Sequence, residues 1–282
     1  MHSPIFSLEI FPPKRNAPVG TIYDTLDGLE GLNPDFISVT YGHGTSSDRT
    51  ATARIAHTVK KEYGIEAVAH LTAMYVTADD VDETLEMFRA AGVASILPLR
   101  GDPVVDRQPA NVFEHASDLA AYIHDQAPEF KLYGACYPEG HFQAPSLDED
   151  IENLRKKVDA GVTHLISQLF YSTDAFLDFL EKARAKGIEV PIEAGIMPPV
   201  LAKSTLNMAS KCGVAIPQQL RTILERWQGN REALQKAGIV YASEQISELV
   251  SAGVDGVHLY SMNHPRVVRR IWSNVDTLFS QE

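Results

Sequence analysis

Short runs of apolar, β-forming residues alternate with longer segments of helical periodicity along the whole 282-residue chain. This alternation is typical of repeated βα units, in which crossover helices join parallel strands. Eight runs are candidates for strands, at 6–11, 36–40, 67–72, 95–99, 132–137, 164–170, 190–196 and 256–260. The pattern therefore predicts an α/β protein built on a parallel sheet.

Amphipathic segments between these runs predict the crossover helices, among them 50–62, 78–91, 147–160 and 173–185. Several such segments end in a glycine, which tolerates the left-handed backbone conformation common at helix C-termini. The glycines concerned are Gly64, Gly92, Gly161, Gly187 and Gly253. Helix, glycine and strand thus recur in a regular order.

This order continues without a change in composition or a Pro/Ser-rich linker, so we expect a single catalytic domain over 1–282. The region 198–253 is too long for one crossover helix, and the seventh unit is predicted to carry extra helices at 217–227 and 231–250. The predicted fold is a (β/α)8 TIM barrel. An open doubly wound sheet would need a Gly-rich phosphate fingerprint near its first turn, where the sequence has none.

Charge and composition exclude several classes of protein. A formal net charge of -12 opposes binding to nucleic acid. No apolar run approaches the ~20 residues of a membrane helix, and the N-terminus lacks the features of a secretory signal, so we expect a cytoplasmic protein. Cys136 and Cys212 lie far apart, no His, Cys or carboxylate set has metal-like spacing, and no metal site is expected.

Glu9 is a lone carboxylate in the apolar run Ser7-Leu8-Glu9-Ile10-Phe11, which stops at Pro12 and Pro13. Burying a carboxylate costs several kcal/mol or raises its pKa. One interpretation is a buried glutamate paired with an arginine or a backbone donor. The other is a general acid at the end of the first strand, which we favour because functional carboxylates often have this setting.

Polar residues follow the other predicted strands, at the end of a barrel where catalytic groups gather. Each has a structural alternative, such as a core histidine, a local ion pair or a loop cap. No GxSxG elbow supports a nucleophile. The residues that would converge on one rim are Thr40, Tyr41, Gly42, His70, Thr72, Arg100, Gly101, Asp102, Tyr137, Glu139, His141, Gln168, Tyr260, Ser261, Met262 and Asn263.

The predicted helix after the fifth strand carries Asp150, Asn153 and Lys157 at i, i+3 and i+7, with Lys156 beside them. These spacings place the residues near one helix face. The face is either a solvated surface or a dinucleotide clamp, in which the lysines neutralise a pyrophosphate and Asp150 and Asn153 bind ribose hydroxyls.

Several of these segments together resemble the bacterial methylenetetrahydrofolate reductases. The resemblance covers nearly the whole chain, and the family's fold is an eight-fold α/β barrel that binds FAD at its C-terminal rim. The matching motifs are Leu8-Glu9-Ile10-Phe11-Pro12-Pro13-Lys14, Ser38-Val39-Thr40-Tyr41-Gly42, Ala69-His70-Leu71-Thr72, Leu99-Arg100-Gly101-Asp102, Tyr137-Pro138-Glu139-Gly140-His141, the run from Asn153 to Gly161, and Gln168.

The resemblance implies a role for each matching position. Glu9 matches the catalytic acid, and Asp102 matches a carboxylate that faces the pterin and also contacts the cofactor. Gln168, Tyr260 and His264 are implied to bind substrate, with His264 standing where an arginine often approaches the folate's glutamate tail. The residues implied to bind FAD or its nicotinamide partner are Thr40, Tyr41, His70, Arg100, Gly101, Asp102, His115, Ala116, Tyr137, His141, Ala144, Asp150, Asn153, Lys156 and Lys157.

The implied reaction is the reduction of 5,10-methylenetetrahydrofolate to 5-methyltetrahydrofolate by NADH or NADPH, in two half-reactions through FAD. Glu9 would give a proton to N10 of the folate, and Asp102 would accept hydrogen bonds from the pterin. The resemblance also implies a homo-oligomer, and some proteins of this fold take electrons from a partner subunit. Two alternatives remain: a folate-dependent methyl transferase or demethylase, and a non-catalytic barrel that binds folate or a partner.

Overall fold

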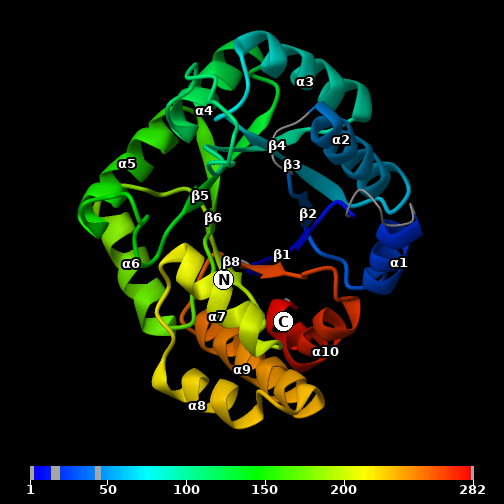
Figure 1. Cartoon of the computed structure of the whole chain (residues 1–282), viewed down its shortest axis with the longest axis vertical. Helices are drawn as coiled ribbons and strands as arrows, with labels where there is room; N and C mark the ends of the chain where they lie inside the picture. The colour runs from blue at the N-terminus through cyan, green and yellow to red at the C-terminus, as the bar shows by residue number, and fades with distance from the viewer. Residues whose placement is uncertain (1–2, 14–19, 42–45, 281–282) are drawn as a thin grey trace. The chain divides into compact units, whose positions relative to one another are not determined.

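The structure is a computed structural model that describes residues 3–13, 20–41 and 46–280. Within these residues, eight strands pair in sequence order and close into a barrel (Figure 1). This confirms the predicted (β/α)8 fold. The strands are β1 (Ile5–Ile10), β2 (Phe36–Val39), β3 (Glu66–Thr72), β4 (Ser95–Leu99), β5 (Lys131–Cys136), β6 (Val162–Ser167), β7 (Ile192–Ile196) and β8 (Gly256–Tyr260).

Helices follow the strands as expected, and the seventh unit carries the predicted extra helices. All five glycines predicted to end helices have positive φ, from 70° at Gly64 to 103° at Gly161. The helices are α1 (Gly20–Leu29), α2 (Ser46–Lys61), α3 (Ala78–Ala91), α4 (Ala116–Gln126), α5 (Leu147–Asp159), α6 (Thr173–Ala185), α7 (Ala202–Cys212), α8 (Gln218–Trp227), α9 (Arg231–Ser251), α10 (Pro265–Val275) and the 3-10 helix η1 (Asp276–Phe279).

The contacts among these elements divide the described chain into two compact units. The first unit contains the described residues of 1–7, 136–155 and 166–282, and the second those of 8–135 and 156–165. Neither unit is continuous in sequence, because β1, β5 and β6 each contribute residues to both. The single catalytic domain over 1–282 stays a prediction.

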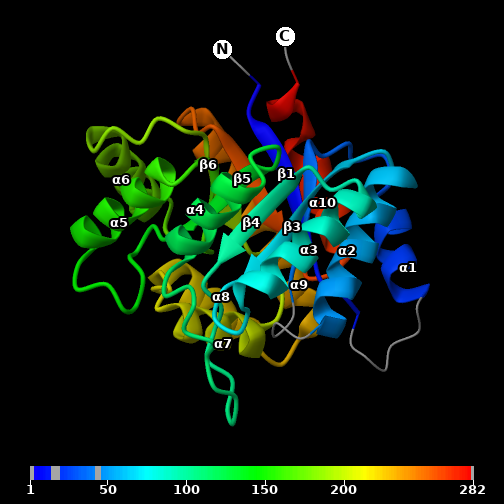
Figure 2. The ribbon, with the colours of Figure 1, turned by 90° about the horizontal axis from the view of Figure 1, so that it is seen from above.

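The second unit contains the register of β2, β3 and β4. Val39 pairs with Ala69, and Ala69 pairs in turn with Ile96. These three side chains are fully buried, as expected for parallel strands covered on both faces. Helices α2 and α3 lie side by side, with α2 also against β3 (Figure 2). Strands β2, β3 and β4 are therefore packed in an apolar interior.

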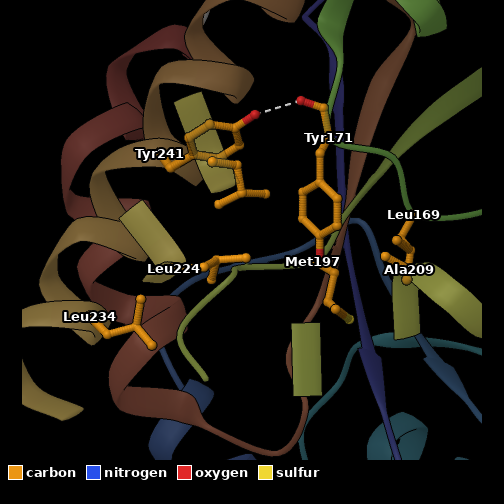
Figure 3. Close-up of a cluster of buried hydrophobic side chains, with 8 residues drawn as sticks. Leu169, Tyr171, Met197, Ala209, Leu224, Leu234 and Tyr241 are labelled. Carbon is orange, nitrogen blue, oxygen red and sulfur yellow. Dashed lines mark hydrogen bonds between the residues drawn. The ribbon is translucent and has the colours of Figure 1, made fainter. Parts of the chain in front are cut away.

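In the first unit, the long helix α9 contacts α6, α8, α10 and β7. A buried cluster joins α7, α8 and α9 to the segments that follow β6 and β7 (Figure 3). The extra helices thus have an apolar core of their own. The cluster consists of Leu169, Tyr171, Met197, Ala209, Leu220, Leu224, Leu234 and Tyr241.

Among the strands, the sixth differs most from its predicted range of 164–170. It begins at Val162 and ends at Ser167. Leu169 and Phe170 are apolar and buried, yet they lie in the following loop, where the Leu169 backbone N–H donates to the side chain of Gln168 at 2.8 Å. An apolar run predicts burial, and here burial comes from packing under helices rather than from strand pairing.

Most other boundaries agree with the sequence within one or two residues. The strands β4 and β8 and the helices α3 and α6 have the predicted bounds, whereas β7 begins two residues after its predicted start. In the described part of the chain, the helices are all too short or too polar to span a bilayer.

Candidate functional site

Glu9 is the penultimate residue of β1, and only 8% of it is exposed. Its carboxylate Oε2 lies 3.7 Å from Nε2 of His70, a buried residue of β3. Burial raises the pKa of Glu9 to about 7, and the charge of His70 opposes part of this rise. A carboxyl group with a pKa near neutral pH can hold a proton and release it under physiological conditions.

The end of β2 lies next to the end of β1 in the same unit. The Thr40 backbone N–H donates to the Ile10 carbonyl at 3.1 Å, and the Thr40 carbonyl accepts from the Thr52 hydroxyl of α2 at 3.0 Å. Tyr41, the next residue, is 7% exposed. The backbone of Thr40 is therefore held on both sides and Tyr41 is buried beside it, whereas Lys14 and Gly42 of the sequence motifs lie outside the described residues.

The segment after β4 presents Arg100, Gly101 and Asp102. Gly101 has a φ of 87°, and a Cβ added there would lie 3.1 Å from Cβ of Thr72, so a larger residue would be both strained and crowded. The Met74 backbone N–H donates to the Arg100 carbonyl at 2.8 Å. Asp102 comes directly after this glycine and is exposed, so its carboxylate is available to a ligand.

Residues farther along this loop hold it in place. The hydroxyl of Tyr75 accepts from the Val104 backbone N–H at 2.5 Å. The guanidinium of Arg107 lies over the Tyr75 ring, 4.2 Å from its centroid. The loop that carries Asp102 is thus anchored to the segment after β3.

The loop after β5 brings Tyr137 and His141 together. Their rings meet edge to face, with centroids 4.7 Å apart. Asp150 at the start of α5 accepts from the His141 backbone N–H at 3.0 Å, and the His141 carbonyl accepts from the Ala144 N–H at 2.8 Å. Because the Gln143 backbone N–H donates to Nδ1 of His141, the neutral ring carries its proton on Nε2.

The predicted dinucleotide clamp is distributed over both units, and its function stays a prediction. Asp150 is half-buried, and Asn153 and Lys156 are exposed. Lys157 is half-buried and donates from Nζ to the Ala135 carbonyl at 2.6 Å. Lys157 therefore positions its charge beside the end of β5.

His115 and Ala116 lie at the N-terminus of α4. The backbone N–H of the exposed His115 donates to a carboxylate oxygen of Asp118 at 2.8 Å. This contact stabilises the start of the helix. A cofactor contact at His115 and Ala116 stays a prediction.

Gln168 follows β6 directly and is half-buried. Its backbone N–H donates to the Cys136 carbonyl at 2.7 Å, and its side-chain oxygen accepts from the Leu169 N–H at 2.8 Å. This second bond fixes the amide, because only the oxygen can accept. The amide nitrogen is then the group that Gln168 presents as a donor.

Tyr260 ends β8 in the same unit, and its hydroxyl donates to the Ser167 carbonyl at 2.7 Å. A Cβ at Gly195 of β7 would lie 2.2 Å from that carbonyl oxygen and 3.0 Å from the Tyr260 hydroxyl. The close approach of these three strands thus depends on a residue without a side chain. His264, another predicted substrate residue, is exposed immediately before α10.

One buried polar network was not predicted from the sequence. Ser7 of β1 donates a short hydrogen bond to the carboxylate of Glu193 on β7. Its oxygen also lies 2.6 Å from Nδ1 of His258 on β8, and all three residues are fully buried. Because Ser7 gives its one hydroxyl proton to Glu193, Nδ1 of His258 must be the donor to Ser7. A lone glutamate in an apolar run is the signal that could have found this network.

Within residues 3–13, 20–41 and 46–280, no group of three or more His, Cys, Asp or Glu side chains is arranged to hold a metal ion. The polar groups at the strand ends are hydrogen-bond donors and acceptors and aromatic rings. Such groups suit an organic ligand.

The family described as methylenetetrahydrofolate reductase matches residues 1–276. Methylenetetrahydrofolate reductase 1 of Schizosaccharomyces pombe is 33% identical over 271 residues, which cover 94% of this chain and 45% of that protein. The 5,10-methylenetetrahydrofolate reductase of Escherichia coli K12 is 33% identical over 258 residues, which cover 91% of this chain and 86% of that protein. The chain spans about half the length of its eukaryotic relatives.

A solved structure with a similar fold is that of an uncharacterized Clostridium thermocellum protein that binds two copies of 5-methyl-5,6,7,8-tetrahydrofolic acid. It matches with a TM-score of 0.67 at 18% identity, and the match covers 99% of this chain and 96% of that one. At this identity, the likeness shows the barrel fold.

Proposed function

The chain belongs to the methylenetetrahydrofolate reductase family, and from this premise we propose that it reduces 5,10-methylenetetrahydrofolate to 5-methyltetrahydrofolate with NADH or NADPH. In this reaction, the nicotinamide is oxidised and the bridging one-carbon unit is reduced to a methyl group. The bond between that carbon and N10 breaks, and a proton is taken up at N10.

The observation that carries this proposal is the environment of Glu9. The reaction needs a proton donor at N10 near neutral pH, and burial raises the pKa of Glu9 to about 7. A glutamate at its ordinary pKa of 4.5 would be almost fully ionised there. The position of Glu9 at the carboxyl end of β1 agrees with the location of catalytic groups in this fold.

Asp102 and Gln168 supply complementary groups for the substrate. Asp102 has an exposed carboxylate, which can accept two hydrogen bonds from the 2-amino pyrimidine edge of the pterin. Its negative charge favours the cation that forms when the folate ring opens. Gln168 has its side-chain oxygen engaged by Leu169, so its amide nitrogen can donate to a folate or nicotinamide carbonyl.

The residues present also fit FAD. Arg100, Lys156 and Lys157 are cations suited to a pyrophosphate, and the edge-to-face pair of Tyr137 and His141 offers aromatic surface to a flat ring system. When bound, FAD supplies the redox centre between the nicotinamide and the folate. We propose that Tyr41, His70, Arg100, Gly101, Tyr137, His141, Ala144, Asp150, Asn153, Lys156 and Lys157 hold it, with Thr40, His115 and Ala116 beside them.

The test begins with the spectrum of the purified chain after addition of FAD. NADH and NADPH are added to separate samples. The reductant that the protein uses should bleach the flavin absorbance, and 5,10-methylenetetrahydrofolate should restore it. The product is identified as 5-methyltetrahydrofolate by chromatography. A protein that takes up no FAD, or whose reduced flavin is not reoxidised by the folate, would contradict the proposal.

Other outcomes would select the alternatives. Demethylation of a methoxy compound by tetrahydrofolate without flavin would indicate the transferase. Folate binding without turnover would indicate a binding protein, and the Clostridium thermocellum protein is itself one that binds 5-methyl-5,6,7,8-tetrahydrofolic acid. The cytoplasmic location, the homo-oligomer and an electron-transfer partner subunit stay predictions.

A further inference from the structure

The loop 168–172, between β6 and α6, is held by side chains from α9, and the end of β6 just before it is held by a side chain from β8. We propose that Tyr241 and Gln245 of α9 are positioning residues, which fix this loop so that Gln168 presents its amide to the substrate. This inference rests on the proposed function, because Gln168 is proposed there to bind folate and nicotinamide. It assigns a role to the extra helix in the seventh βα unit.

Two backbone carbonyls of the loop accept hydrogen bonds from α9. The Tyr171 carbonyl accepts from the Tyr241 hydroxyl at 2.6 Å (Figure 3). The Phe170 carbonyl accepts from the amide nitrogen of Gln245 at 3.1 Å. Tyr241 and Gln245 are separated by one helical turn and are 8% and 4% exposed, so both bonds are shielded from water.

A third carbonyl, that of Ser167, is held from β8 by the Tyr260 hydroxyl at 2.7 Å. The Ser167 hydroxyl oxygen accepts from the Gly195 backbone N–H at 2.8 Å. Gln168 therefore lies between a strand end fixed by β7 and β8 and a loop fixed by α9. Neither end of this short segment can move without breaking buried hydrogen bonds.

The same face of α9 is closely seated on the segment after β7. A Cβ added at Gly238 would lie 2.5 Å from the Pro199 carbonyl oxygen. Gly238, Tyr241 and Gln245 are at i, i+3 and i+7, which places them on one helix face. The close approach at Gly238 sets the distance at which Tyr241 and Gln245 reach the loop.

Apolar side chains of the loop add to the packing that holds it. Phe170 is fully buried and stacks on Phe176 of α6, with centroids 4.8 Å apart. Tyr171 is 2% exposed and belongs to the cluster that contains Tyr241. The Tyr241 hydroxyl is protonated at neutral pH and remains a donor, and burial raises its pKa further, to about 12.

The variants Tyr241→Phe and Gln245→Met remove one donor each and keep most of the side-chain volume. Each should raise the KM for 5,10-methylenetetrahydrofolate about fivefold to tenfold, the order expected for loss of one buried hydrogen bond, and should leave kcat within about twofold. Tyr122→Phe is the matched control. It removes a 2.9 Å hydrogen bond to Asp82 in the other unit and should leave both constants unchanged.

A double-mutant cycle tests whether Tyr241 acts through Gln168. In a Gln168→Ala background, adding Tyr241→Phe should raise the folate KM no more than about twofold further, because the Gln168 amide that Tyr241 positions is already absent. If the two losses multiply, or if Tyr241→Phe alone leaves the KM unchanged, the positioning role is overturned.

Hydrogen exchange gives a readout that needs no activity. Amides of 168–172 should exchange about tenfold faster in Tyr241→Phe and Gln245→Met than in the wild type or Tyr122→Phe, measured without FAD or folate. Unchanged exchange rates would show that Tyr241 and Gln245 do not fix the loop. A wild type that neither binds nor reduces folate would overturn the proposed function, whereas the exchange rates would still decide whether α9 fixes the loop.

Discussion

Glu9 and Glu193 are both buried glutamates on barrel strands, but their surroundings differ. Glu193 lies near the start of β7 and accepts a short hydrogen bond from Ser7, which His258 also contacts. Glu9 lies near the end of β1 with His70 at 3.7 Å, and burial raises its pKa to about 7. Burial alone therefore does not mark a reactive acid. The position on the strand and the partners distinguish the two.

The largest expected difference is in folate reduction. Glu9→Gln removes the proposed proton donor and should slow reduction of 5,10-methylenetetrahydrofolate about 10²-fold to 10⁴-fold. Flavin reduction by NADH should change less than about threefold, because it needs no proton at N10. Rapid-mixing absorbance separates the two half-reactions.

Glu193→Gln is the matched control, because it makes the same chemical change at the other buried glutamate. Its folate half-reaction should stay within about threefold of the wild type, since Glu193 belongs to a structural network. Equal losses in the two variants would contradict the distinction between them.

The next largest effect is on stability. The Glu9 pKa is raised, so the folded state binds more protons than the unfolded state between pH 4.5 and about 7. Its ionisation therefore lowers the free energy of unfolding as pH rises through this window, by about 3 kcal/mol in all. Glu9→Gln cannot ionise and should gain about that much relative to the wild type between pH 4.5 and 8. Urea titrations at several pH values measure it, and a difference independent of pH would show that Glu9 has an ordinary pKa.

A smaller loss of stability is expected in the other network. Ser7→Ala removes the hydroxyl that joins Glu193 to His258 and should lower the free energy of unfolding by about 1–3 kcal/mol. The KM and kcat for folate should stay within about twofold. If Ser7→Ala instead abolishes turnover with stability intact, the Ser7 network belongs to the active site.

The smallest effect concerns the pair at Glu9. The charge of His70 lowers the Glu9 pKa, so His70→Asn should move it further upward. A carbon NMR titration of the Glu9 carboxyl in protein without FAD measures this shift. A downward shift would mean that His70 stabilises the neutral acid.

The barrel can be predicted from the sequence because its signals, the glycines that end helices and the spacing of apolar residues, lie within short segments. The bounds of β4, β8, α3 and α6 agree with that pattern. The sixth strand was misplaced because its run of apolar residues continues into a loop, where Leu169 gives its N–H to Gln168. No local pattern distinguishes burial in a strand from burial beneath helices.

The candidate site was predicted unevenly for a similar reason. Glu9 was identified as a lone carboxylate in an apolar run, and Glu193 has the same local signal in Pro191-Ile192-Glu193-Ala194-Gly195. The two glutamates differ because Ser7 bonds to Glu193 and contacts His258. Ser7 is 186 positions from Glu193 and 251 from His258 in the sequence. The α9 contacts with the loop 168–172 likewise join residues about 70 positions apart, which a reading of single segments does not reveal.

Gly195 has a consequence for how this chain can vary. Its missing methyl group is the space in which the Ser167 carbonyl and the Tyr260 hydroxyl meet. Every other amino acid would put a carbon atom into that space, so a single substitution there collides with two neighbours at once. Any larger residue at this position would therefore have to push the Ser167 backbone of β6 away from β7, besides displacing the end of the Tyr260 side chain.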